Sequence, residues 1–457
     1  MLKARKATKP VSYSALDNVQ TKGIHYKITA LSAAGVFLDG YDISIIGVAL
    51  TIITAISAFS YATTPLGKGL MAASTTIGML VGAIVFGYIT DKRGRKLMYM
   101  WDMVIFIIFT AAIALATSYW YLFSFRVILG LAIGADYAIS TTIISEFSPK
   151  RSRGKLLAVN VSAWWIGSAI AFVIGFLLLP LGINSWRIMF AIGIIPAAIV
   201  LFLRRTVPES ARWLAMSGQP EKARAVEKEI SGKSDVLKTQ KKNVSIFTLF
   251  SKKYIKATIF VALFWFSYDV AFYGIGLFTP TILELFGLAH RMAILGSAIF
   301  ATIAVIGSFL AIATIDRWGR KAITILGFSG MSVALIVLSL IAITTPKSAF
   351  TAGVLGGVIV SMYILFELTQ TWGPGGTDFV YPQELFPTNI RATGQGWGTS
   401  VSRIGAILGL VGFPEIVAAA GLGYGLLFFF IFAIIGLLST ILLAPETRDK
   451  SLEELTE

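Results

Sequence analysis

The sequence predicts an all-α membrane protein with about twelve transmembrane helices in two pseudo-symmetric six-helix bundles. Its 457 residues are 56% hydrophobic and 14% charged, with a mean hydropathy of +0.78, which is too apolar for a soluble domain of ordinary composition. Runs of about 20 apolar residues, long enough to span a bilayer, recur along the whole chain. Short charged motifs also occur twice at a nearly constant spacing, which indicates a duplicated bundle.

The apolar runs, taken in order, form two sets of six. They lie near residues 28–56, 68–90, 97–117, 119–144, 155–180, 186–205, 256–286, 292–315, 321–344, 350–384, 392–418 and 421–443. The predicted organisation is a cytoplasmic N-terminal tail at 1–27, a first bundle at 28–205, a cytoplasmic linker at 206–255, a second bundle at 256–443 and a cytoplasmic C-terminal tail at 444–457.

The distribution of Lys and Arg predicts which ends of the spans face the cytoplasm. Thirteen of these residues fall in 204–256, whereas the alternate loops contain only Lys68, Arg187, Arg291 and Lys347. Because cytoplasmic loops are enriched in cations, we expect a multi-pass protein of the cell membrane with both termini in the cytoplasm. The formal net charge of +15 is then a signal of topology and does not predict a nucleic-acid partner.

The composition also excludes several kinds of chemistry. The chain has no cysteine, which removes disulfides, thiolate catalysis and Cys-ligated metals. Its two histidines, His25 and His290, fall at or outside the ends of the predicted spans, so a histidine relay inside the bundle is not expected. No motif pairs a nucleophile with a base. The sequence therefore predicts no enzyme, no metal and no cofactor, and we expect a monomer whose partners are the bilayer, a small solute and a proton.

Three landmarks of the first half recur in the second. Asp91 to Arg95 recurs as Asp316 to Arg320, Glu146 with Arg153 recurs as Glu384 with Arg391, and Pro208-Glu209 recurs as Pro445-Glu446, at spacings of 225, 238 and 237 residues. Ion pairs repeated on the cytoplasmic side of both halves predict a charge latch that must break when the protein opens inward. The expected pairs are Asp91 with Arg95 and Glu146 with Arg153. The predicted latch residues are Asp91, Arg95, Glu146, Arg153, Glu209, Arg212, Asp316, Arg320, Glu384, Arg391 and Glu446.

One carboxylate, Asp269, lies in the middle of an apolar run. A charge at this depth in a bilayer costs roughly 2.5–3.5 kcal/mol, so it predicts a functional site that faces a partner or a water-filled cavity. Trp265, Asp269 and Tyr273 share one face of a helix, with a drift of about 40° per step. Arg403 is expected at a similar depth, and because its guanidinium cannot lose its proton, Asp269 is its expected partner.

This pair suggests how an anion and a proton could be coupled. A guanidinium matches phosphate or carboxylate in bidentate fashion, so an incoming anion would compete with Asp269 for Arg403. Protonation of Asp269 would remove the competition. Other acids inside the predicted spans include Asp39, Asp42, Asp102 and Asp136, and Asp39 and Asp42, three residues apart, can share a cavity. Glu367 and Asp378 could line the outer path or satisfy each other.

The motifs resemble a known family. The stretch from Gly87 to Lys96, its second copy at 316–321, and the Pro-Glu motifs at 208–214 and 445–454 are similar to the major facilitator superfamily, in the branch of sugar porters, phosphate:proton symporters and aromatic-acid:proton symporters. The resemblance covers the chain from about Phe37 onward. It implies a central site at the bilayer midplane and alternating access by rocking of the two halves.

Within that branch, the intramembrane residues resemble the phosphate:proton symporters most closely. Gly134-Ala-Asp136-Tyr137, the Trp265, Asp269 and Tyr273 triplet, and the stretch from Gly373 to Thr393 carry the similarity. The resemblance implies that Tyr137, Trp265, Asp269, Tyr273 and Arg403 surround the substrate, and that Asp136 together with Asp42 or Asp39 serves the proton path. Trp164 is a further candidate for the substrate site. The candidate proton-coupling residues are then Asp39, Asp42, Asp102, Asp136 and Asp269. Two positions depart from the family pattern, since Arg403 replaces a lysine and Trp164 or a neighbour replaces a glutamine.

The sequence therefore predicts a proton-coupled symporter that imports a small anion, with inorganic phosphate as the first candidate. The motif at 39–42, the stretch at 391–397 and the neighbourhood of Arg403 also look like the aromatic-acid symporters, and Trp164 with Trp165 would suit a ring. A sugar symporter, an uncoupled uniporter and a non-transporting sensor are the remaining alternatives.

Overall fold

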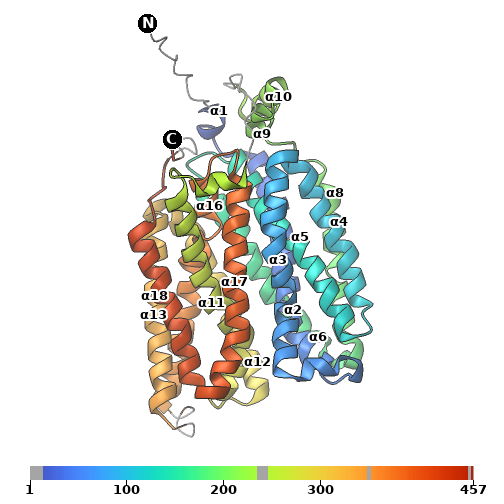
Figure 1. Cartoon of the computed structure of the whole chain (residues 1–457), viewed down its shortest axis with the longest axis vertical. Helices are drawn as coiled ribbons and strands as arrows, with labels where there is room; N and C mark the ends of the chain where they lie inside the picture. Colours follow the sequence, from blue (N-terminus) through green and yellow to red (C-terminus); the bar gives the residue numbers. More distant parts are fainter. Residues whose placement is uncertain (1–13, 234–244, 347–349, 351–352, 451–453, 456–457) are drawn as a thin grey trace.

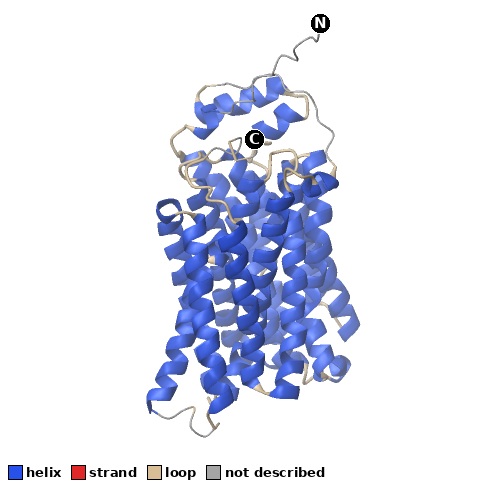
Figure 2. Ribbon diagram, turned by 60° about the vertical axis from the view of Figure 1, so that its left-hand side comes forward, coloured by secondary structure: helices blue, strands red, loops and turns tan. Residues whose placement is uncertain are grey.

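The computed structural model describes residues 14–233, 245–346, 350, 353–450 and 454–455, and within them it is built of helices. Figure 2 shows long helices that run side by side, with short helices across one end. The first half comprises α2 (Gly23–Ile53), η1 (Ser57–Thr63), α3 (Pro65–Arg93), α4 (Arg95–Ala114), α5 (Tyr119–Phe147), α6 (Arg153–Leu178), η2 (Leu179–Asn184), α7 (Ser185–Ala191) and α8 (Ile194–Arg204). The second half comprises α11 (Ile255–Leu285), α12 (His290–Trp318), α13 (Arg320–Thr344), α14 (Gly353–Trp372), α15 (Pro374–Thr377), α16 (Val380–Leu385), α17 (Arg391–Ala420) and α18 (Leu422–Leu443).

The prediction of a polytopic helical membrane protein is confirmed. Eleven segments in the described part of the chain are long and apolar enough to span a membrane. One of them, residues 153–204, is 52 residues long and turns back through η2, so it supplies two passes and brings the total to the predicted twelve. The apolar side chains on the outside of the bundle are in keeping with a lipid environment.

Both chain termini lie at the same end of the bundle, which we call the terminal face (Figure 1). The short helices α1 (Ser14–Asp17), α9 (Ala211–Met216) and α10 (Pro220–Ser231) also lie there, and η3 (Ile246–Phe250) precedes the second half. We call the opposite end the distal face. An even number of passes in each half explains why both ends of the chain and the linker meet on one side.

The two halves pack side by side along two pairs of helices, α3 against α17 and α6 against α12. Small residues permit the close approach. A Cβ added at Gly396 on α17 would lie 2.2 Å from the carbonyl oxygen of Ala83 on α3, and one added at Gly87 would lie 2.5 Å from that of Ala392. Close backbone contact through small residues is how helices associate in a membrane, where apolar burial gives little drive.

The duplication extends to the backbone. Gly94 joins α3 to α4 at φ 106°, and Gly319 joins α12 to α13 at φ 88°, in a region that L side chains rarely adopt. The tenth pass is broken instead of continuous, because Gly373 and Pro374 separate α14 from α15. This break brings Asp378 to the centre of the molecule.

Candidate functional site

The centre of the molecule contains an ion pair between two helices of the second half. Nη1 of Arg403 on α17 lies 3.3 Å from a carboxylate oxygen of Asp269 on α11, and the two residues are 2% and 1% exposed. Arg403 also hydrogen-bonds to the hydroxyl of Tyr273, one turn beyond Asp269. Its guanidinium carbon lies 5.4 Å from the ring centroid of Tyr137 on α5, which belongs to the first half. The cation therefore sits where the two halves meet.

A small cavity, the central pocket, surrounds this pair. It is lined by Tyr137, Val161, Trp164, Trp165, Tyr268, Asp269, Phe272, Tyr273, Asp378, Phe379 and Arg403. It leaves about 20 Å³ for the centre of a water molecule, and about 10–15 Å³ is enough for one water. The pocket thus has room for about one water molecule. Asp378 is a second carboxylate, after Asp269, in the pocket that contains the guanidinium of Arg403.

Trp265 lies apart from the pocket. Its side chain is fully buried, and its ring packs edge-on against Phe379 at a centroid distance of 5.1 Å. The drift of about 40° per step turns Trp265 by about 40° from Asp269 and by about 80° from Tyr273, so the three side chains do not all point into one pocket.

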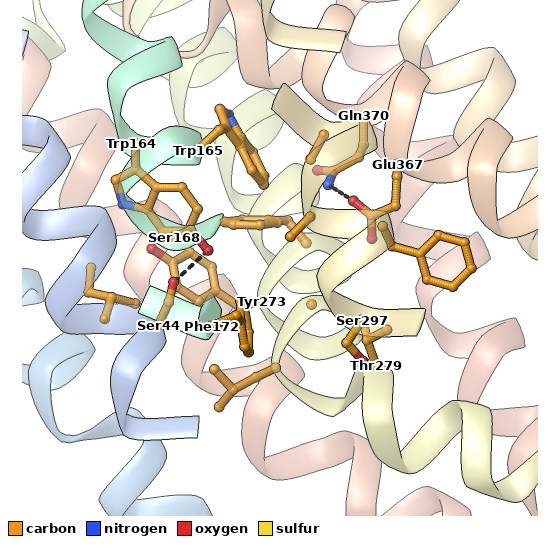
Figure 3. Close-up of a pocket in the computed structure, with 17 residues that line it drawn as sticks. Ser44, Trp164, Trp165, Ser168, Phe172, Tyr273, Thr279, Ser297, Glu367 and Gln370 are labelled. Carbon is orange, nitrogen blue, oxygen red and sulfur yellow. Dashed lines mark hydrogen bonds between the residues drawn. The ribbon is translucent and has the colours of Figure 1, made fainter. Parts of the chain in front are cut away.

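A second, distal cavity lies beyond the central pocket (Figure 3). It leaves about 60 Å³ for water centres and is lined from both halves. Its lining includes Ser44, Trp164, Trp165, Ser168, Phe172, Phe272, Tyr273, Thr279, Ser297, Phe300, Glu367 and Gln370. Glu367 and Gln370 belong to α14, and the other residues come from the middle and the distal halves of α2, α6, α11 and α12, so the cavity extends from the centre toward the distal face.

Aromatic rings separate the two cavities. Phe272 lines both of them and packs edge-on against Trp164 at 5.4 Å and Trp165 at 5.0 Å. Tyr273 and the two tryptophans also line both cavities. A solute that passes from the distal cavity to Arg403 must displace or slide along these rings.

The first half contains a buried cluster of acids around one arginine. Arg204, at the end of α8, pairs with Asp102 on α4 and with Asp136 on α5, each at 2.9 Å. Asp39 on α2 is also fully buried, but neither of its carboxylate oxygens has a hydrogen-bond partner in the described part of the chain. Sequence reasoning missed Arg204, because a cation at the end of a span looks like any other cytoplasmic cation.

Asp39 and Asp42 differ in their surroundings. A carboxylate oxygen of Asp42 lies 3.4 Å from Nη1 of Arg126 on α5, and Arg126 also donates to the hydroxyl of Ser74 at 3.0 Å. Asp42 is thus compensated by a buried cation, whereas no ion pair joins Asp39 to a cation in the described part of the chain.

At the terminal face, the predicted latch residues join the two halves. Glu146 accepts from Arg95 of its own half at 3.0 Å and from Arg391 of the other half at 3.1 Å. Asp91 pairs with Arg95 and also accepts from the backbone N–H of Thr393, across the interface, at 2.8 Å. These contacts close the terminal face.

The second copy of the latch has the same central arginine with two carboxylates, all three from the second half. Arg320 pairs with Asp316 at 2.9 Å and Glu384 at 2.8 Å. Asp316 reaches across the interface and accepts from the backbone N–H of Lys155 at 3.1 Å. The expected partner of Glu146 was Arg153, but the structure places Arg153 beside Asp17 of α1 at 2.7 Å, together with Arg212. The N-terminal helix, which sequence reasoning left out, therefore completes this cluster.

Two latch carboxylates cap helices. Glu209 accepts from the backbone N–H groups of Arg95 and Lys96 at the start of α4, and Glu446 accepts from those of Arg320 and Lys321 at the start of α13. A carboxylate there satisfies free N–H groups and complements the helix dipole. Burial raises the pKa of Glu209, while the backbone hydrogen bonds that it accepts oppose the rise.

We expect the latch to control opening of the terminal face. Glu146→Gln removes the charge shared by two buried arginines, a change that costs several kcal/mol in a buried pair. Leu157 is fully buried in an apolar cluster that also contains Ile315, Ile323 and Val380 of the other half, and the chain has no natural cysteine. Maleimide labelling of a Leu157→Cys protein should therefore become at least about tenfold faster when Glu146→Gln is added. The exposed Glu415→Gln change is the control, and an unchanged rate would contradict this role of Glu146.

No three His, Asp or Glu side chains of the described residues converge as a metal site would require. The site thus consists of ion pairs, hydroxyl groups and aromatic rings. Such groups can bind and release a polar solute and a proton.

Comparison with known proteins identifies the family. Residues 28–457 match the family described as "Sugar (and other) transporter". The chain is 31% identical to YaaU of Escherichia coli (strain K12), with 96% of each chain covered. It is 30% identical to "Probable inorganic phosphate transporter 1-6" of Arabidopsis thaliana, covering 97% of this chain and 95% of that one. It is 27% identical to "Niacin transporter NiaP" of Acinetobacter baylyi (strain ATCC 33305 / BD413 / ADP1), covering 97% and 99%.

A solved structure shows the same fold. The proton:xylose symporter XylE bound to 6-bromo-6-deoxy-D-glucose matches with a TM-score of 0.80 at 24% identity, over 94% of this chain and 98% of that one. The predicted family and fold are therefore confirmed, as is the prediction that the protein is not an enzyme. The chain belongs to the sugar (and other) transporter family of the major facilitator superfamily and is a multi-pass membrane transporter of a small solute.

Proposed function

We propose that the protein is a proton-coupled symporter that imports a small anion, with inorganic phosphate as the first candidate, and that Arg403 binds the anion. The observation that carries the proposal is the buried pair of Arg403 and Asp269 in a pocket between the two halves. Arg403 keeps its charge at any physiological pH, and its Nε has no hydrogen-bond partner among the described residues. A guanidinium with a free donor beside the Tyr273 hydroxyl suits a bidentate oxyanion.

Coupling follows from the competition between two negative groups. An anion that approaches Arg403 meets the charge of Asp269, and like charges in a low-dielectric pocket repel each other strongly. Protonation of Asp269 removes this repulsion and frees the guanidinium. Anion and proton would then enter together and leave together.

An aromatic carboxylate is the second candidate, and the walls of the pocket favour it. Trp164, Trp165 and Phe272 present ring faces and edges between the distal cavity and Arg403. Such walls suit a flat ring, whereas phosphate has no apolar part to contact them. The relative named as a niacin transporter and the relative named as a phosphate transporter support one candidate each.

The conformation fits the distal-facing side of an alternating-access cycle. The named hydrogen bonds between the halves gather at the terminal face, whereas the larger of the two cavities lies on the distal side. We propose that the termini face the cytoplasm of the cell membrane, so that this state receives solute from outside. Release inward would then require the contacts of Glu146 and Asp91 to break.

Uptake into proteoliposomes tests the proposal. Phosphate, benzoate and glucose are each offered with and without an imposed pH gradient. We expect one of the two anions to accumulate only with the gradient and glucose not to accumulate. Uptake that does not depend on the pH gradient would indicate a uniporter, and accumulation of glucose would indicate a sugar symporter. Either result would overturn the proposed function.

We expect Asp39, and not Asp42, to carry the proton in the first half. Asp39→Asn should abolish gradient-driven accumulation, because it removes the acid that lacks its own cation. Asp42→Asn should instead lower the melting temperature, because it leaves Arg126 buried and unpaired, which costs about 3–5 kcal/mol. Uptake assays and thermal unfolding of both variants check this. Normal accumulation by Asp39→Asn would contradict it.

A further inference from the structure

A second buried carboxylate lies in the distal cavity, away from Arg403. Glu367 on α14 is 5% exposed, and its Oε2 accepts from Nε2 of Gln370 at 2.8 Å (Figure 3). It does not pair with Asp378, which accepts from the backbone N–H of Phe379 and lines the central pocket. Each of these two acids therefore faces its own cavity.

The groups that face Glu367 carry no compensating positive charge. The described residues that line the distal cavity include no Lys, Arg or His. The titratable neighbours are Tyr268 on α11 and Tyr363 on α14, and Tyr273 of α11 lines the same cavity. Between their first and last turns, α12 and α13 contain no charged residue. An acid at this depth with a neutral amide as its hydrogen-bond partner is costly to keep ionised, which points to a proton-binding role.

Gln370 connects Glu367 to the central pocket. The hydroxyl of Tyr268 donates to Oε1 of Gln370 at 3.0 Å, while the other end of the same amide donates to Glu367. Tyr268 lines the central pocket together with Asp269 and Asp378. A row of three side chains thus runs from the distal cavity to the place where an anion would bind.

The direction of these hydrogen bonds depends on the proton of Glu367. An ionised carboxylate only accepts, so the amide must donate to it and must accept from Tyr268. A protonated Glu367 can donate to Oε1, and the amide can then turn over and donate to the oxygen of Tyr268. The hydrogen of the Tyr268 hydroxyl becomes free to point into the central pocket.

We propose that Glu367 is a second proton-binding group of this transporter, and that its protonation strengthens anion binding by releasing Tyr268 as a hydrogen-bond donor. The inference rests on the proposed anion transport. It assigns Gln370 as a positioning residue, because its amide transmits the protonation state between two cavities. A proton taken up from the distal side would thereby favour the binding of the anion that follows it.

Equilibrium binding of phosphate and of benzoate, followed by tryptophan fluorescence, tests this inference. Asp269→Asn serves as the background, so that titration of Asp269 does not contribute. We expect this protein to bind the anion about tenfold more tightly on the acidic side of neutrality than on the alkaline side, which corresponds to about one hydrogen bond to a charged group. Adding Glu367→Gln, Gln370→Met or Tyr268→Phe should each reduce the ratio to about twofold or less.

The control is Glu415→Gln in the same background, because Glu415 is an exposed acid on α17 whose replacement should leave the pH ratio unchanged. A pH ratio that persists in the Glu367→Gln protein would overturn the inference. A Glu367→Gln protein with a lower yield or melting temperature but an unchanged pH ratio of anion affinity would also overturn the inference, since a purely structural role of Glu367 predicts that result. If wild-type vesicles show no gradient-driven uptake of either anion, the proposed function fails as well. If wild-type vesicles do show gradient-driven uptake of an anion but the pH ratio persists in the Glu367→Gln protein, only this inference fails.

Discussion

Replacing Asp269 with asparagine is expected to abolish pH-driven accumulation of the anion. The amide is nearly isosteric but cannot carry the proton, and it presents no charge for the anion to displace from Arg403. Exchange of labelled for unlabelled anion needs no net proton movement and should persist. Counterflow and gradient-driven uptake, measured in the same proteoliposomes, separate the two activities.

The buried surroundings of Asp269 make a control for folding necessary. Glu415→Gln removes an exposed acid of the second half and should leave accumulation unchanged. If the Asp269→Asn protein neither accumulates nor exchanges the anion, the variant is misfolded, and a lowered melting temperature would show this. Accumulation at the wild-type level would remove Asp269 from the proton path.

Replacing Arg403 with glutamine is expected to raise the half-saturation concentration for the anion at least about 100-fold. A bidentate guanidinium contributes two charge-assisted hydrogen bonds, each about 1.5–3 kcal/mol, and about 1.4 kcal/mol changes affinity tenfold. Arg403→Lys keeps the charge but not the forked guanidinium, so its half-saturation concentration should lie between those of the wild type and of Arg403→Gln. Initial rates of uptake over a range of anion concentrations measure the effect.

Arg403→Gln also leaves Asp269 buried without its cation, so a loss of affinity could arise from destabilisation of the protein. Combining Arg403→Gln with Asp269→Asn should restore the melting temperature, because no unpaired charge remains, but it should not restore affinity. Arg187→Gln, far from the pocket on α7, is the matched control for loss of an arginine. Near-normal affinity in the double variant would favour a neutral solute and count against an anion.

The helices and their number followed from hydropathy alone, because a bilayer demands apolar runs of a fixed length whatever their order. The repeated motifs gave the two halves for a similar reason, since duplicated segments keep the same charges at the same depth. The expected pair of Asp91 with Arg95 and its copy, Asp316 with Arg320, are both present. Glu146 pairs with Arg95 and Arg391 instead of the expected Arg153, because Arg153 pairs with Asp17, a residue of the N-terminal segment that has no apolar pattern.

Composition and spacing were thus sufficient for the helical membrane fold and the family, and for a buried Asp269 opposite Arg403. The three-dimensional packing decided the rest. It placed Arg204 between Asp102 and Asp136, left Asp39 without a partner, and carried Asp378 into the pocket through a broken helix. Helical spacing reports which residues of one segment share a face, but the direction of that face and the neighbour it meets depend on contacts between segments far apart in the chain.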